Sequence, residues 1–135
     1  QSQPQVGKVH IVNSVVGNKP PIAEDTISGR YAQTLFIVAS KANELHGVYQ
    51  DMNYIKDVYS ASESFRTFAG NAGLNSTQIN LFVDDLAKCG GFSNSTVIFL
   101  DLLGKNKRFM YINEIAQKYI KSYNLLSKEE KIKII

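Results

Sequence analysis

Residues 28–42 read SGRYAQTLFIVASKA, and this stretch decides how the rest of the chain is interpreted. Wound as an α-helix at about 100° per residue, it places Tyr31, Leu35 and Val38, with the phenylalanine and the alanines, on an arc of roughly 160°. Ile37 lies apart from them, among polar residues. A helix that packs one face against a core needs an apolar arc of only roughly 100°. We therefore predict a helix whose apolar surface exceeds the needs of one packing face.

The composition bounds the class of protein. The chain has 135 residues, 44% hydrophobic and 20% charged, as expected for one globular domain with its own core. No apolar run approaches the roughly 18 residues that a membrane-spanning helix needs. Because the sequence begins without methionine and without a signal segment, we expect a mature form that has lost any targeting peptide. The single cysteine, Cys89, excludes an internal disulfide and fits a reducing compartment.

The net charge of +3 is unevenly distributed along the chain. Residues 1–103 contain seven Lys or Arg and nine Asp or Glu, whereas residues 104–135 contain eight and three. A basic segment of this kind can meet nucleic acid, acidic lipid headgroups or an acidic protein partner, or it can be a solvated helix face.

Apolar residues repeat at three- and four-residue spacing after residue 27, which predicts an all-α domain of six helices. The first is expected to begin at an N-cap Ser28, the second near residues 43–44, and the third to cover residues 63–69. Residues 1–27 hold a valine-rich run too short to form a sheet alone. We expect them to form an extended arm that is ordered against a partner.

The fourth predicted helix has clear start and stop signals. Asn75 and Gln78 have the spacing of a capping box, and Gly90 with Gly91 suits the helix end. Cys89 falls on the apolar stripe, where a cysteine behaves as a small core hydrophobe.

The fifth helix, from residues 94–95 to about residue 103, is apolar in nearly every direction. Such a helix is normally buried on all sides, which is difficult in a domain this small, so a partner covering one side is expected. The sixth runs from about residue 108 to residue 125. Beyond it, Ser127 and Glu130 favour another helix, but Lys131–Ile134 alternate with a period of two and favour a strand.

No group of residues has the chemistry of an active site. His10 lies in the arm, and His46 lies beside Glu44, where a surface role is more common than catalysis. Asp84 and Asp85 are adjacent on one helix, so their side chains diverge by about 100° and cannot act as an acid–base pair. We therefore predict no catalytic residue, no metal site, no cofactor and no enzymatic activity.

Residues 105–121 offer an alternative function. Their lysines and arginine are interleaved with tyrosines, as in a small helical nucleic-acid-binding module. Tyr119 and Tyr123, however, lie on the apolar stripe of the sixth helix, where core aromatics are the simpler interpretation.

Two sequence blocks carry a family resemblance. Gly29–Ala32 (GRYA) and the small apolar run after it resemble the opening of the delta/OSCP family, the stator subunits of the F-type ATP synthase. Phe99–Arg108 (FLDLLGKNKR) resembles the end of that family's fifth helix, and Ile112–Tyr119 continues the pattern. The resemblance covers residues 20–135, and Pro20–Ile22 is more similar to the mitochondrial form. Phe109 and Met110 depart from the pattern, since the family more often has leucine there.

The resemblance also implies a domain division. It gives an arm at residues 1–27, a six-helix N-terminal domain at 28–126, and a linker at 127–135 that leads into a missing, strand-containing C-terminal domain. In that interpretation Lys131–Ile135 begins the first strand of the second domain.

The family's N-terminal domain is a six-helix bundle whose first and fifth helices form a groove for the N-terminal helix of an ATP synthase alpha subunit. The resemblance therefore implies partner-binding residues in both helices of this chain. The predicted groove residues are Tyr31, Thr34, Leu35, Val38, Ile98, Phe99 and Leu102. The predicted polar rim consists of Arg30, Lys41 and Asp101.

The implied function is mechanical and non-catalytic. Such a subunit clamps the catalytic head to the peripheral stalk through alpha subunits and peripheral-stalk subunits, with no nucleic acid as partner. The resemblance places it on the matrix side of the mitochondrial inner membrane, with membrane association only through the complex.

Overall fold

A computed structural model describes residues 11–71 and 73–134 of the chain, with side chains as far as residue 128. The described residues form six α-helices and two short 3₁₀ helices, with no strand among them, so the all-α prediction is confirmed. The elements are η1 (Val16–Asn18), α1 (Ile27–Lys41), α2 (Leu45–Ala61), α3 (Glu63–Ala69), α4 (Ser76–Gly90), α5 (Asn94–Lys105), η2 (Phe109–Tyr111) and α6 (Ile112–Ile134).

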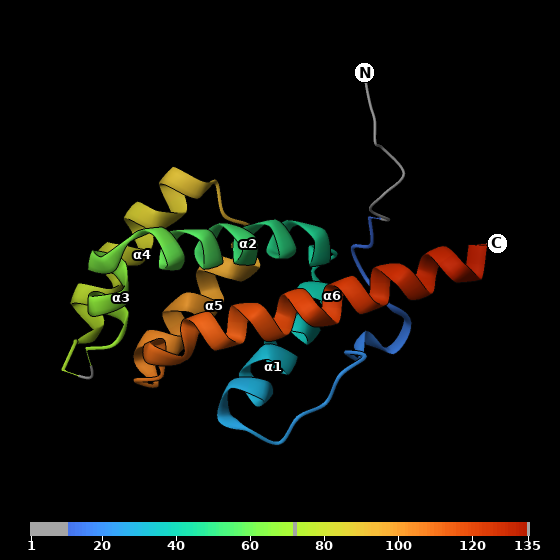
Figure 1. Cartoon of the computed structure of the whole chain (residues 1–135), viewed down its shortest axis with the longest axis horizontal. Helices are drawn as coiled ribbons and strands as arrows, with labels where there is room; N and C mark the ends of the chain where they lie inside the picture. The colour runs from blue at the N-terminus through green and yellow to red at the C-terminus, as the bar shows by residue number, and fades with distance from the viewer. Residues whose placement is uncertain (1–10, 72, 135) are drawn as a thin grey trace.

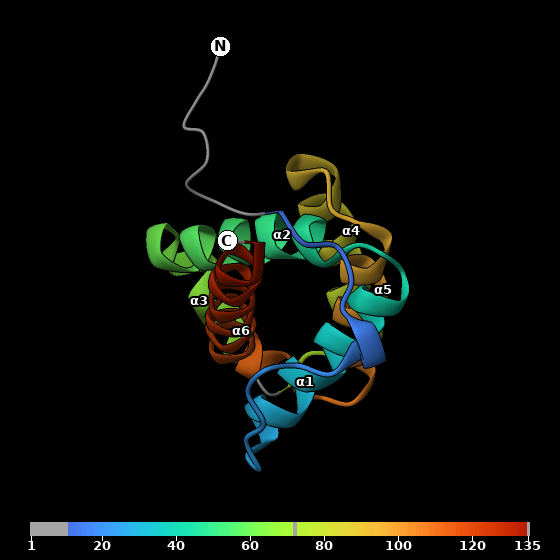
Figure 2. The same cartoon turned by 90° about the vertical axis from the view of Figure 1, so that its right-hand side faces the viewer.

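The two longest helices, α2 and α6, pack against each other along the long axis of the molecule (Figure 1). Helix α1 also packs on α6, and α5 contacts α1, α2 and α4. Viewed nearly along α6, the helices α1, α2, α5 and α6 surround a common centre (Figure 2). Core side chains fill that centre. The largest fully buried ones are Tyr119, Tyr123, Phe36, Leu35, Leu45, Met52, Ile55, Leu100, Leu103, Ile112, Ile115 and Val48.

Local sequence signals fix most helix ends. Asn75 and Gln78 form the predicted capping box of α4, and Gly91 ends that helix in the left-handed conformation with φ 62°. The predicted cap of α1 is wrong by two residues, because Thr26 accepts the capping hydrogen bond from the backbone N–H of Gly29. Ser28 is instead buried, with its hydroxyl 3.5 Å from Glu114 of α6.

Carboxylates from α2 and its cap hold the start of α5. The backbone N–H of Ser93 and the hydroxyl of Thr96 both donate to Asp51, at 2.8 and 2.6 Å. The backbone N–H and hydroxyl of Ser95 donate to Glu44, at 3.1 and 2.5 Å. Negative charge at a helix N-terminus satisfies otherwise unpaired N–H groups and complements the helix dipole. The position of α5 on the bundle is therefore fixed by polar contacts as well as by its apolar side chains.

Two sequence predictions fail near helix ends. Cys89 is exposed rather than part of the core, because the buried positions of α4 follow Ile79, Val83 and Leu86 toward Gly90. The predicted strand at Lys131–Ile134 is also wrong, since α6 continues without a break to Ile134. No Gly or Pro interrupts the chain after residue 112, so nothing stops the helix at the predicted end near residue 125.

The described part of the arm, residues 11–26, packs on the bundle itself. Val12 is buried, and its backbone N–H donates to the Tyr123 hydroxyl of α6 at 3.0 Å. Asn13 caps α2 by accepting from the backbone N–H groups of Leu45 and His46, each at 3.2 Å. The described residues of the arm therefore contact the chain's own bundle, whereas the sequence-based expectation was an arm ordered against a partner. Residues 1–10 of the arm lie outside the described residues.

The contact between the arm and α6 leads to a first prediction. We expect Tyr123→Phe to lower the free energy of unfolding by about 1 kcal/mol, because Val12 loses a buried hydrogen-bond acceptor. The larger effect is on local hydrogen exchange. The amide of Val12 should exchange its hydrogen faster, while amides within α2 keep their protection. Hydrogen exchange followed by NMR measures both. Equal protection of Val12 in the two proteins would contradict the role assigned to the Tyr123 hydroxyl.

Candidate partner-binding site

One face of α1 carries apolar side chains that are partly exposed to solvent. Ile27, Tyr31, Thr34 and Val38 follow one another at three- and four-residue spacing, which places them on one helix face. Ile27 is 43% exposed and Val38 37% exposed, Thr34 is exposed, and Tyr31 is half-buried. This face accounts for the excess apolar surface of the first helix.

Helix α5 adds to the same region. Ile98 is 56% exposed and Leu102 38% exposed, one turn apart on α5. The two helices contact each other: the Tyr31 ring meets the ring of Phe99 edge-on at 6.3 Å between centroids. Asn106, at the end of α5, donates a hydrogen bond to the Tyr31 hydroxyl at 3.0 Å. Helices α1 and α5 are therefore neighbours in the bundle, as Figures 1 and 2 show for their ribbons, and each carries exposed apolar side chains.

Two of the predicted groove residues lie in the core. Leu35 has no exposed surface and Phe99 is 3% exposed. Side chains this deeply buried cannot contact a partner without a rearrangement of the bundle. The other predicted groove residues, Tyr31, Thr34 and Val38 on α1 and Ile98 and Leu102 on α5, are half-buried or exposed.

The predicted rim residues are at the surface. Arg30 and Lys41 are exposed and Asp101 is half-buried. Arg30 pairs with Asp25, and Asp101 pairs with Lys105 one turn later at 3.3 Å. Exposed pairs of this kind contribute little to stability.

Sequence reasoning missed two residues at one end of this surface. A hollow of about 330 Å³ is lined by Ile27, Arg30, Tyr31, Thr34 and Arg108. Ile27 precedes the expected N-cap, so it was not counted as helical. Arg108 lies far along the chain, in the turn after α5, and only the folded structure brings it to the start of α1. A second hollow of about 300 Å³, between α4 and α5, includes Ile98 and Asp101 in its lining.

Titratable groups inside the bundle serve the fold. Burial raises the pKa of Asp51, which caps α5, and burial lowers the pKa of His46. The Nδ1 atom of His46 lies 3.0 Å from the Tyr123 hydroxyl, in a cluster of rings that includes Tyr49. Burial also raises the pKa of Tyr119, whose hydroxyl donates to the backbone carbonyl of Leu45 at 2.7 Å. These contacts join α2, α5 and α6 and do not form an active-site arrangement.

Other kinds of site find little support in the described part of the chain. No three His, Cys, Asp or Glu side chains of residues 11–71 and 73–128 gather closely enough to hold a metal ion. None of the helices described has both the length and the apolar character needed to cross a membrane. Of the tyrosines in the alternative nucleic-acid surface, Tyr119 and Tyr123 are fully buried and cannot stack on a base.

The sequence matches the family described as ATP synthase delta (OSCP) subunit over residues 27–135. The chain belongs to the delta (OSCP) family. The delta (OSCP) subunit is a non-catalytic component of ATP synthase. Membership thus agrees with the six-helix fold and with the two sequence blocks on α1 and α5.

Relatives come from mitochondria and from bacteria. The chain is similar to mitochondrial ATP synthase subunit O of Drosophila melanogaster, with 25% identity over 75% of this chain and 48% of the relative. It is also similar to ATP synthase subunit delta of Macrococcus caseolyticus, with 27% identity over 80% of this chain and 60% of the relative. The chain therefore spans about half to three-fifths of the length of these delta (OSCP) relatives.

A solved structure shows the same fold. The match is a chain in the cryo-EM structure of the Toxoplasma gondii mitochondrial ATP synthase hexamer, with a TM-score of 0.65 and 30% sequence identity. It covers 70% of this chain and 53% of the Toxoplasma gondii chain. The arrangement of helices described above is therefore found in a chain of an assembled ATP synthase.

Proposed function

We propose that this chain is a stator subunit that connects the catalytic head of ATP synthase to its peripheral stalk, by docking alpha-subunit N-terminal helices between α1 and α5. The observation that carries the proposal is the presence of exposed apolar side chains on two helices that contact each other. Val38 with Ile27 on α1, and Ile98 with Leu102 on α5, offer aliphatic anchors on adjacent helices. Helix-in-groove recognition uses anchors at this spacing.

The proposed mechanism is mechanical. Rotation of a central rotor exerts torque on the catalytic head, and a stator must hold the head still. A lasting contact of this kind needs an apolar centre that excludes water and a polar rim that sets orientation. The exposed aliphatic residues supply the centre, and Arg30, Lys41 and Asp101 supply the rim.

We place the proposed complex at the mitochondrial inner membrane, on the matrix side. The Drosophila melanogaster relative and the Toxoplasma gondii structure, both mitochondrial by name, support this location. Bacterial relatives are equally similar in sequence, so the assignment rests on those two and on Pro20–Ile22. Peripheral-stalk subunits are the further partners, and membrane association comes only through the complex.

Binding of a peptide tests the groove. We expect the double variant Ile98→Asp, Leu102→Asp to bind a synthetic alpha-subunit N-terminal peptide at least tenfold more weakly, because charge replaces two desolvated anchors. Isothermal titration calorimetry measures the affinity, and circular dichroism checks the helix content. Phe99→Asp is a poor choice, since that side chain is buried. Leu81→Asp on α4, at a side chain 64% exposed, is the matched control and should bind normally. Normal affinity of a folded double variant would show that this groove is not the binding site for the peptide.

A further inference from the structure

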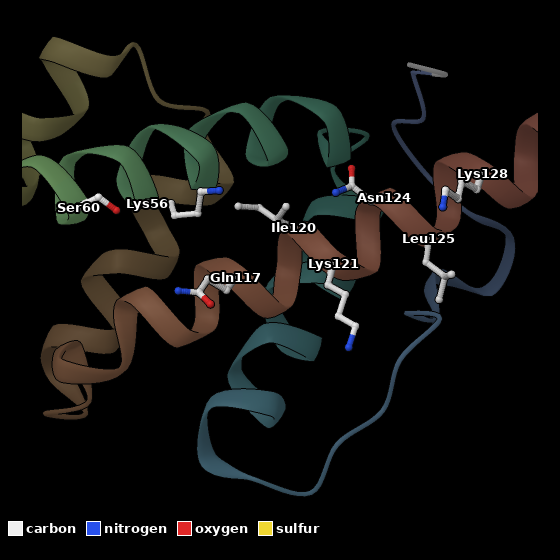
Figure 3. Close-up of a pocket in the computed structure, with 8 residues that line it drawn as sticks. All are labelled: Lys56, Ser60, Gln117, Ile120, Lys121, Asn124, Leu125 and Lys128. Atoms are coloured by element: carbon white, nitrogen blue, oxygen red, sulfur yellow. The ribbon is translucent and has the colours of Figure 1, made fainter. Parts of the chain in front are cut away.

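A second surface, separate from the α1–α5 groove, lies across α2 and α6. It is an open hollow of about 610 Å³, to which α2 contributes Lys56 and Ser60 (Figure 3). Helix α6 contributes the remaining lining residues, from Gln117 to Lys128. Because α2 and α6 pack along each other, this hollow follows the long axis of the bundle. Its shape suits an elongated occupant.

The charge of this surface has one sign. Lys56, Lys121 and Lys128 line it, and no acidic residue does so among the described residues. None of the three lysines forms an ion pair with a described residue, whereas Lys118, one turn before Lys121, is paired with Glu24 at 2.6 Å. Lys121, together with Lys118, lowers the pKa of Glu24, so the positive charge of Lys121 already interacts with an acidic residue. Lys56 and Lys128 have no ion-pair partner among the residues that the structure describes.

Apolar side chains lie between these charges. Ile120 points from α6 toward Lys56 of α2, and Leu125 projects from the other side of α6 (Figure 3). Leu125 is 39% exposed and Ile120 is half-buried. Asn124 points toward α2 between them and offers both a donor and an acceptor. Solvated lysines alone need no partner, but exposed aliphatic groups between them gain from being covered.

We propose that this surface docks an acidic amphipathic helix from another subunit of the ATP synthase complex. Its carboxylates would pair with Lys56 and Lys128, and its apolar face would cover Ile120 and Leu125. A protein helix is favoured over nucleic acid because none of the described residues that line the surface is aromatic and able to stack on a base. The inference rests on the proposed function in one respect, that the chain works inside ATP synthase. It does not depend on the α1–α5 groove.

Photocross-linking in the assembled enzyme tests this proposal. Asn124 is replaced by the photoreactive residue p-benzoylphenylalanine in the full chain, the ATP synthase is purified, and cross-linked peptides are sequenced by mass spectrometry. We expect a cross-link to a helical, Asp- or Glu-rich segment of another subunit. A cross-link to nucleic acid, to a segment without acidic residues, or to no subunit would overturn the inference.

Charge reversal provides the second readout. We expect Lys56→Glu with Lys128→Glu to lower the cross-link yield by roughly tenfold, and added salt to lower it in the parent protein. The matched control, Lys19→Glu with Lys88→Glu, changes the net charge equally at two exposed sites outside the surface and should leave the yield unchanged. Equal cross-link yields in the two double variants would overturn this inference and leave the proposed function standing. Absence of the chain from the purified enzyme would instead contradict the proposed function itself.

Discussion

Replacing Asp51 with alanine is expected to lower the free energy of unfolding by about 3 kcal/mol, measured by urea unfolding at neutral pH. The Asp51 side chain is buried and accepts from the backbone N–H of Ser93 and the hydroxyl of Thr96. Both donors lie at the start of α5, and Thr96 has no exposed surface. Alanine would leave these donors without an acceptor in a place that water does not readily reach, which costs more than the hydrogen bonds themselves.

Asparagine is the control for Asp51. Both donors point to a single carboxylate oxygen, which the amide oxygen of Asp51→Asn can replace in the same position. We therefore expect Asp51→Asn to lose less than about 1 kcal/mol, because the acceptor is kept and no charge is buried. Equal destabilisation by alanine and asparagine would mean that the negative charge, and not the acceptor, holds α5.

The stabilities of the parent protein and of Asp51→Asn should also depend differently on pH. Burial raises the pKa of Asp51, so the folded protein holds a proton there more tightly than the unfolded chain does. This group therefore contributes stability that is fully present below the ordinary aspartate pKa and is lost as pH rises through the raised value. Asp51→Asn cannot titrate and should lack that contribution. Urea unfolding at a series of acidic pH values measures the difference.

The helices could be predicted from the sequence because their signals are local. The capping box of Asn75 and Gln78 lies within one turn, and the apolar stripe of α2 lies within one helix. The start of α5 at Asn94 agrees with the predicted start at residues 94–95, but the groups that hold it could not be predicted, since they are carboxylates more than forty residues earlier in the chain. The packing of the arm on the bundle could not be predicted for a similar reason. Val12 is held by Tyr123, at the opposite end of the sequence.

The candidate site could be predicted only to the level of its two helices. Periodicity shows that α1 and α5 carry more apolar surface than one packing face needs, but it does not show which residues are covered. Leu35 and Val38 fall on the same predicted arc, yet the fold buries one of them and leaves the other at the surface. That distinction depends on how α1 sits on α6, which no single-helix pattern contains.

This distinction supplies the last prediction, a comparison of two alanine variants one turn apart on α1. Leu35→Ala should lower the free energy of unfolding by about 3 kcal/mol, because it leaves a cavity in the core. Val38→Ala should change it by less than about 0.5 kcal/mol, since its side chain is 37% exposed. Binding should show the opposite order. Under conditions where both proteins are folded, Val38→Ala should lower the affinity for the alpha-subunit peptide several-fold. Leu35→Ala should bind the peptide with almost normal affinity, because only Val38 reaches the partner. Urea unfolding and calorimetric titration measure the two quantities on the same samples. If Leu35→Ala weakened binding more than Val38→Ala did, the bundle would have to open to receive its partner, and the surface described here would not be the docking site.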